Sequence, residues 1–242
     1  KPGFQTLLKT CPVYAIWDDH DYGVNDGGSE FPAKELAKAE LYRFLGVPKS
    51  EPSNTRDGVY RSAQYGTGER TVKVILLDTR WFRDPLERTS GSNPTYLPNK
   101  TGTLLGGAQW RWLEKELKEN TAAVTVIVSS IQLLAQDHRF EKWANFPNER
   151  ARLLDLLNNY ASGITLVISG DRHAAEISAL ELSGWKRPLL DVTSSGLTNV
   201  WRRKYDEINS LAITDKVIEP NYGLISINWD EPEDPVVKVS IK

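Results

Sequence analysis

The chain has 242 residues, of which 40% are hydrophobic and 26% are charged, with a formal net charge of -2. This length and composition suit one large domain, residues 1–242, with its own hydrophobic core. The near-neutral charge gives no basic surface for nucleic acid, and no apolar stretch approaches a membrane span in length. The single cysteine, Cys11, excludes an intrachain disulfide, and we expect its thiol to be buried.

Hydrophobic patterning in the first half of the chain predicts a buried strand, a helix and two more strands. The strand is expected at 13–17, the helix at 32–45 and the two further strands at 58–64 and 72–78. Five apolar residues are expected on the buried face of the helix: Leu36, Ala37, Leu41, Phe44 and Leu45. The segment 79–107 lacks periodicity, and long loops of this kind are usually functional or mobile.

The second half of the chain alternates helices with apolar strands. Helices are expected at 108–120 and 148–161, and the strands at 122–129 and 164–169 follow them directly. Four more strands are expected at 175–182, 189–193, 223–229 and 236–241. Helical crossovers combined with segments that contain only strands predict an α/β (α+β) fold with two packed sheets flanked by helices.

Two polar clusters each follow an apolar strand. Residues 17–26 read WDDHDYGVND and hold four aspartates, one histidine and one asparagine, whereas residues 164–173 run from an apolar strand into Gly-Asp-Arg-His. Most Asp-rich loops are only solvated turns. Two such clusters at strand ends favour a shared metal site instead, since carboxylate, amide and imidazole groups ligate calcium, iron, manganese or zinc.

The carboxyl ends of strands are where ligands gather in sheets of this type. Asp78, Arg80 and Gln132 also follow predicted strands. Arg80 could hold phosphate as a bidentate partner, or it could form a structural pair with Asp78. The third histidine, His138, is expected at the surface or at the rim of a substrate site. Most of the eight tryptophans are expected in the core, although Trp201 and others could line a cleft.

Six segments, in this order, carry a resemblance to a known family: WDDHDYGVND, LLDTRWFRDPL, SSIQLL, NFPNERARLL, SGDRHAAEIS and VTSSGLTN. They resemble the PhoD-like alkaline phosphatases of the calcineurin-like metallophosphoesterase superfamily. The resemblance implies a four-layer αββα sandwich with a metal centre at the strand ends.

The resemblance also implies roles for individual residues. Asp19, Asn25, Asp171 and His173 would be metal ligands, and His20 would protonate the leaving group or steady the transition state. The superfamily's middle metal-binding histidine has no match in this chain, and Gln132 stands near its place. Arg172 is expected to point away from the metals.

PhoD-like proteins carry a ligand cysteine and a Gly-Asp-x-x-Tyr motif upstream of the segment that resembles the start of this chain. That motif supplies a bridging aspartate and a tyrosine ligand, and this chain contains neither. We therefore expect a chain that lacks its amino-terminal part and binds metal less tightly than its relatives.

The leading functional hypothesis is metal-dependent hydrolysis of small phosphate mono- or diesters. Calcium and iron are the favoured cofactors, with manganese or zinc as alternatives. Likeness to exported phosphatases implies a secreted or periplasmic location. Two alternatives stay open: a catalytically impaired remnant or binding module on the same fold, and a metallohydrolase that acts on a non-phosphate ester.

Overall fold

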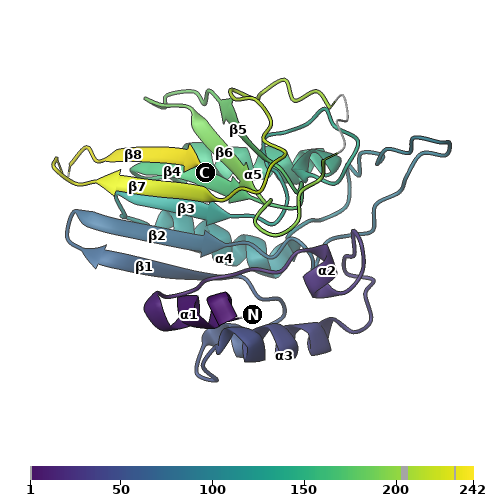
Figure 1. Cartoon of the computed structure of the whole chain (residues 1–242), viewed down its shortest axis with the longest axis horizontal. Helices are drawn as coiled ribbons and strands as arrows, with labels where there is room; N and C mark the ends of the chain where they lie inside the picture. Colours follow the sequence, from purple (N-terminus) through teal and green to yellow (C-terminus); the bar gives the residue numbers. More distant parts are fainter. Residues whose placement is uncertain (1, 203–206, 232) are drawn as a thin grey trace.

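A mixed six-stranded sheet forms the centre of the protein (Figure 1). The structure is a computed structural model that describes residues 2–202, 207–231 and 233–242. The helices are α1 (Pro2–Thr10), α2 (Asp19–Tyr22), α3 (Lys34–Leu45), α4 (Gly106–Lys118) and α5 (Pro147–Tyr160). The strands are β1 (Arg61–Thr67), β2 (Arg70–Leu76), β3 (Val124–Val128), β4 (Ile164–Ser169), β5 (Ala175–Leu180), β6 (Leu189–Ser194), β7 (Gly223–Asn228) and β8 (Val236–Ile241).

The order of strands in the large sheet is β1-β2-β3-β4-β6-β5. Strands β2, β3, β4 and β6 run parallel, whereas β1 and β5 pair antiparallel at the two edges. Helix α4 connects β2 to β3, and α5 connects β3 to β4. The carboxyl ends of four strands therefore meet along one edge of the sheet, as the sequence predicts.

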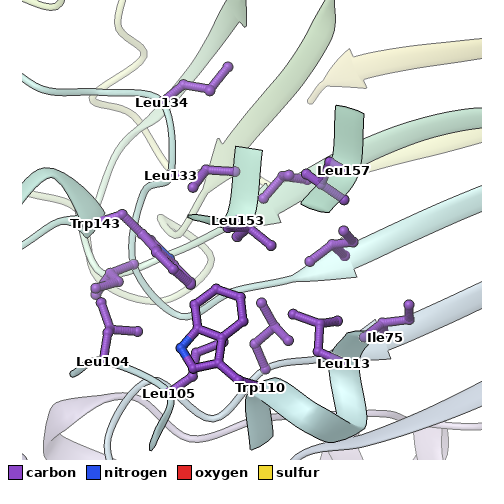
Figure 2. Close-up of a cluster of buried hydrophobic side chains, with 14 of the residues drawn as sticks. Ile75, Leu104, Leu105, Trp110, Leu113, Leu133, Leu134, Trp143, Leu153 and Leu157 are labelled. Atoms are coloured by element: carbon purple, nitrogen blue, oxygen red, sulfur yellow. The ribbon is translucent and has the colours of Figure 1, made fainter. Parts of the chain in front are cut away.

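Helices α4 and α5 cover one face of this sheet and bury the largest apolar cluster (Figure 2). Trp110 and Leu113 of α4 and Leu153 of α5 pack with Ile75 and Val167 from the strands. These helical residues recur at the three- to four-residue spacing that gives an amphipathic helix one apolar face. Their packing fixes both helices against the sheet.

The hairpin β7–β8 forms a second sheet that covers the opposite face. Ile225, Ile227 and Val239 of the hairpin pack with Val126 and Leu166 of the large sheet. The described residues thus form a sandwich of helices, sheet and sheet, and its mixed α/β class is the one expected. No described helix covers the outer face of β7–β8, so the fourth layer of the predicted sandwich is not seen in the described ranges.

The predicted strand at 13–17 does not form. This segment is extended but pairs with no strand in the described part of the chain. Trp17 instead stacks on Trp81 with ring centroids 6.2 Å apart, and its Nε1 donates to Oδ1 of Asp78 at 2.9 Å. Trp17 is therefore buried by side-chain packing rather than by a sheet, whereas Tyr14 of the same segment is exposed. Cys11, at the end of α1, is exposed, which corrects the expectation of a buried thiol.

The buried face of helix α3 overlaps the predicted one, since Ala37 and Leu41 pack against a buried cluster, but other positions lie deepest. Lys38 and Tyr42 are buried, whereas Leu36 is 64% exposed and Phe44 lies outside, stacked on Phe4. The long stem of Lys38 passes along the ring of Tyr42, and its Nζ donates to the carbonyl of Arg56. An amphipathic lysine can fill a core position when its ammonium group has such partners.

No helix in the described residues is long and apolar enough to cross a membrane.

Candidate metal centre

Three carboxylates converge at the carboxyl edge of the large sheet. Asp18, Asp19 and Asp171 each offer an oxygen, and these oxygens all lie within 4.8 Å of one another. Asp18 and Asp19 begin α2 at the start of the acidic loop (residues 17–28), and Asp171 follows β4. The two polar clusters that the sequence predicts to share a site therefore do meet. We call these three residues the carboxylate trio.

The acidic loop folds back on Asp19. The Oδ1 atom of Asp19 accepts the backbone N–H of His20 at 2.7 Å, and Oδ2 accepts that of Asp26 at 3.1 Å. Asp26 is anchored in turn by the long loop, because its Oδ2 accepts hydrogen bonds from Arg88 and from the hydroxyl of Tyr96. The predicted segment 79–107 thus helps to fix the orientation of one trio member.

The turn after β4 sets Asp171. The N–H of Gly170 donates to the carbonyl of Ser130 at 3.0 Å, which ties the ends of β3 and β4 together. Within the described ranges, the non-glycine residues with a positive φ are Asp26 at 50°, Asp171 at 66° and His173 at 50°. Such backbone conformations cost free energy and tend to gather at functional sites. All three residues belong to the turns that form this centre.

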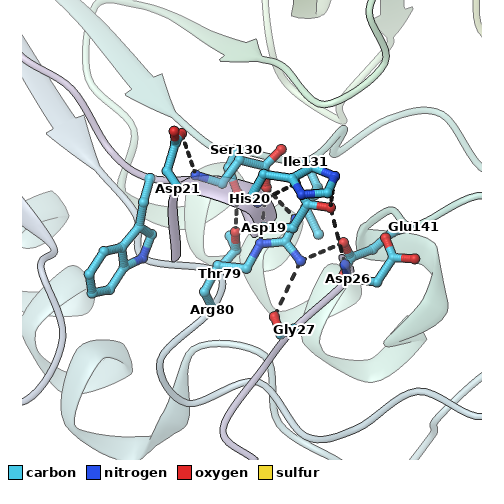
Figure 3. Close-up of polar contacts among 12 residues, drawn as sticks. Asp19, His20, Asp21, Asp26, Gly27, Thr79, Arg80, Ser130, Ile131 and Glu141 are labelled. Carbon is cyan, nitrogen blue, oxygen red and sulfur yellow. Dashed lines mark hydrogen bonds and ion pairs between the residues drawn. The ribbon is translucent and has the colours of Figure 1, made fainter. Parts of the chain in front are cut away.

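A buried ion-pair chain contacts Asp18, and Figure 3 shows its members Arg80 and Glu141. The Nε atom of Arg80 lies 3.0 Å from Asp18 Oδ1, and its Nη1 lies 2.6 Å from Glu141 Oε2. Glu141 also pairs with Arg83, whose Nε lies 3.1 Å from Oε1. The side chains of Arg80, Arg83 and Glu141 are all fully buried. A planar guanidinium fixed on two sides holds a carboxylate in one orientation.

Burial and mutual repulsion act on the acidity of the trio. Burial raises the pKa of Asp18, and the neighbouring Asp19 raises it further, while the positive charge of Arg80 acts in the opposite direction. Burial also raises the pKa of Asp171 well above its ordinary value, with Asp18 and Glu141 adding to the effect. Closely spaced carboxylates of this kind need a proton or a cation among them.

His20 projects from the same loop into solvent. Its side chain is 74% exposed, and its Nε2 lies 3.9 Å from Asp19 Oδ2. The structure therefore places this predicted catalytic residue next to a trio member and leaves its ring accessible.

The two other predicted ligands lie in the same turns. Asn25 is exposed and donates through Nδ2 to Asp26 Oδ2 at 2.6 Å. The Nδ1 atom of His173 lies 3.3 Å from Nδ2 of Asn199. Within the described part of the chain, neither residue makes a hydrogen bond or ion pair with the trio, so their assignment as ligands stays a prediction.

The sequence offers two roles for Arg80, phosphate binding or a structural pair with Asp78, and its buried position favours neither. The guanidinium is buried between Asp18 and Glu141, and it does not reach the carboxylate of Asp78. Asp78 accepts instead the backbone N–H groups of Arg80 and Trp81, together with the indole N–H of Trp17. Asp78 is therefore a structural carboxylate that closes the turn after β2.

His138 is buried, which corrects the expectation of a surface or rim position. Gln132 donates through Nε2 to Glu176 Oε1 at 2.9 Å and to Thr193 Oγ1 at 2.8 Å. Its Oε1 must then accept the Nε2–H of His138, at 2.8 Å. Burial lowers the pKa of His138 to about 2, and the positive charges of Arg172 and Lys142 contribute. The ring is therefore neutral, and Gln132 belongs to this network.

Arg172 pairs with a glutamate, and its expected orientation away from the metals stays a prediction. Its Nη2 lies 2.8 Å from Glu207 Oε2, and its guanidinium covers the ring of Phe140.

A cavity of about 370 Å³ opens beside the trio. Asp18, Ser130 and Asp171 contribute its polar lining, and apolar residues such as Ile168 and Ile225 contribute the rest. The cavity therefore lies where the ends of β3 and β4 face β7. A small molecule placed there would contact two of the three carboxylates.

The sequence analysis does not identify two residues that the structure places in the centre. Asp18 lies inside the WDDHD run, and its adjacency to Asp19 was the available signal. Glu141 lies in a polar stretch between β3 and α5, and no local pattern marks it as the partner of Arg80. Only the tertiary structure brings it there.

Comparison with known proteins agrees with this geometry. The model of the family described as PhoD-like phosphatase matches residues 1–193. Alkaline phosphatase D from Bacillus subtilis (strain 168) is 26% identical, over 71% of this chain and 32% of that protein. A solved structure described as "Structure of PhoD" superposes with a TM-score of 0.61 at 19% identity, over 93% of this chain and 51% of the other.

The chain spans about a third of the length of the curated relative and about half of the solved structure. The similarity in structure shows a shared fold, and the family match covers most of the sequence, including the whole carboxylate trio. The chain therefore belongs to the PhoD-like phosphatase family.

Proposed function

We propose that this protein hydrolyses small phosphate mono- or diesters with the help of bound metal ions. The observation that carries the proposal is the meeting of Asp18, Asp19 and Asp171 at the carboxyl ends of the strands, beside a cavity. Membership of the PhoD-like phosphatase family supports the same chemistry. A secreted or periplasmic location stays a prediction from the resemblance.

The donor set fits a hard cation. Three carboxylate oxygens within 4.8 Å of one another suit calcium, manganese or ferric iron better than a soft metal. Asp18, Asp19 and Asp171 would hold the ion, and we propose Asn25 and His173 as further ligands. A bound metal ion would supply charge neutralisation on the phosphoryl oxygens and an acidified water at moderate pH. Calcium and iron are the proposed cofactors, with manganese and zinc as alternatives.

His20 and Arg80 have separate roles in this proposal. His20 is accessible beside Asp19, so its imidazolium is placed to protonate a departing alkoxide at the mouth of the site. Arg80 is fully buried and paired twice, so we assign it to positioning Asp18 rather than to direct contact with phosphate. In this proposal His20 acts at the exposed mouth of the site, and Arg80 acts from the interior.

Turnover of p-nitrophenyl phosphate and bis-p-nitrophenyl phosphate tests the proposal directly. The metal-stripped chain is assayed alone and after addition of calcium, iron, manganese or zinc, with p-nitrophenyl acetate as the non-phosphate ester. Release of nitrophenol from a phosphate ester only after metal addition is the expected result. Turnover of the acetate alone would favour a different hydrolase, and cation binding without any turnover would favour a binding module.

A further inference from the structure

Three aromatic rings form a row that begins in the turn after β4. The ring of His173, two residues after Asp171, lies 6.3 Å from the ring of Trp201, and Trp201 lies 5.5 Å from Phe140. The backbone N–H of Trp201 donates to the carbonyl of His173 at 2.9 Å. The position of the indole is therefore tied to the same turn that sets Asp171.

A buried ion pair supports this row of rings from behind. The guanidinium of Arg172 lies 4.2 Å from the centre of the Phe140 ring. Arg172 is held by Glu207, which also accepts Lys216 Nζ at 2.7 Å. A cation held on a ring face by its own ion pair restricts the ring. The aromatic row is thus a fixed surface rather than a set of freely moving side chains.

The outer part of the row is open to solvent. Trp201 is 38% exposed, although a tryptophan contributes most when its large apolar surface is covered. A hollow of about 270 Å³ lies along the same loop and is lined by Leu197, Asn199 and Arg202, among others. We propose that Trp201, Phe140 and His173 form a subsite that binds an aromatic group of a phosphate ester while its phosphate lies at the trio.

Two guanidinium groups border the Phe140 end of the row. Arg139 lies 4.8 Å from the Phe140 ring, and Arg172, which is paired with Glu207, lies 4.2 Å from it. An aromatic ring can stack on the indole, and this gain adds to the attraction of the phosphate for the metal site. This subsite rests on the proposed function, because the phosphate anchors the ligand.

Binding of two phosphonates to the calcium-loaded protein, measured by titration calorimetry, tests the subsite without requiring turnover. Phenylphosphonate and methylphosphonate share the anionic group and differ in the ring. We expect phenylphosphonate to bind about tenfold more tightly, the ratio typical of one stacked ring. Trp201→Ala should remove this preference, and Trp201→Phe should restore most of it.

Tyr160→Ala is the matched control, because Tyr160 is also 38% exposed but lies at the end of α5. This variant should keep the tenfold preference. Equal binding of the two phosphonates to the unmodified protein, or an unchanged preference in Trp201→Ala, would overturn the subsite alone. If neither phosphonate binds, both the subsite and the proposed phosphate site are contradicted.

Discussion

The Nε atom of Arg80 lies 3.0 Å from Oδ1 of Asp18, although 62 residues separate them in the sequence. This contact joins the turn after β2 to the acidic loop. Because Arg80 is also held by Glu141, the orientation of Asp18 depends on a residue that lies outside the trio. The geometry of the centre is thus set partly by a buried ion-pair chain.

The substitution Glu141→Gln tests that chain. Glu141 is fully buried between Arg80 and Arg83, so the neutral amide would leave two buried cations without their shared counter-charge. We expect the free energy of unfolding to fall by about 3–5 kcal/mol, the usual cost of breaking a buried pair. Urea denaturation followed by circular dichroism measures it.

Glu114→Gln is the control for this substitution. Glu114 pairs with Lys118 at 2.6 Å on the surface of α4, where solvent screens the interaction. Its midpoint in urea should barely move. Similar shifts in the two variants would show that the buried chain contributes no more than a surface pair.

Replacement of a trio member should weaken cation binding. Asp171→Asn keeps the size of the side chain and removes one anionic oxygen from the group. We expect calcium affinity to fall tenfold or more, since even groups outside the metal's direct ligands cost that much. Titration calorimetry measures the change. Asp234→Asn, at a surface pair with Arg187, should leave the affinity unchanged, and equal losses would place the site elsewhere.

Cation binding should strengthen as the pH rises. The pKa values of Asp18 and Asp171 are raised, so at lower pH these groups carry protons that a cation must displace. Calcium binding should therefore release protons, detected by calorimetry in two buffers with different ionisation enthalpies. Without metal, folding favours the protonated forms, so stability should fall as the pH rises through the raised pKa values. Calcium affinity that does not change with pH would contradict this account.

The buried His138 should make the protein less stable in acid. Its pKa is lowered to about 2, whereas an unfolded histidine titrates near 6.5. The unfolded state therefore binds a proton that the folded state does not bind, so the free energy of unfolding decreases as the pH falls below about 6.5. Between pH 7 and pH 5 the loss should be about 2 kcal/mol.

His138→Gln keeps a hydrogen-bond donor toward Gln132 and removes the titrating ring. Its urea midpoint should depend less on pH over this interval than that of the unmodified protein. An identical pH dependence in the two proteins would assign the acid sensitivity to other groups.

The sequence predicts the elements that local pattern controls. Strand β4 has the predicted bounds, and α4 and α5 begin and end within two residues of them, because amphipathic periodicity decides these segments. The apolar run at 13–17 does not form the predicted strand, because an apolar composition also suits a segment that buries only Trp17, against Trp81. Local pattern does not separate these two outcomes.

The candidate centre is predictable only in part. Two Asp/His clusters at strand ends correctly indicate a shared site, and Asp19 and Asp171 do meet. The partnership of Arg80 with Glu141 depends on how a long loop passes over the sheet edge, and no periodicity encodes it. The burial of His138 likewise depends on Gln132, whose amide is held by Glu176 of β5 and Thr193 of β6.

The ion-pair chain behind the trio also sets the charge that a ligand would meet. Asp18, Asp19, Asp171 and Glu141 carry four negative charges when ionised, and Arg80 and Arg83 supply two positive charges. The ionised cluster therefore has a net charge of about -2, which one divalent ion would neutralise. Removal of either arginine would increase this excess of negative charge, so the arginines reduce the positive charge that a ligand must supply as well as holding Asp18 in place.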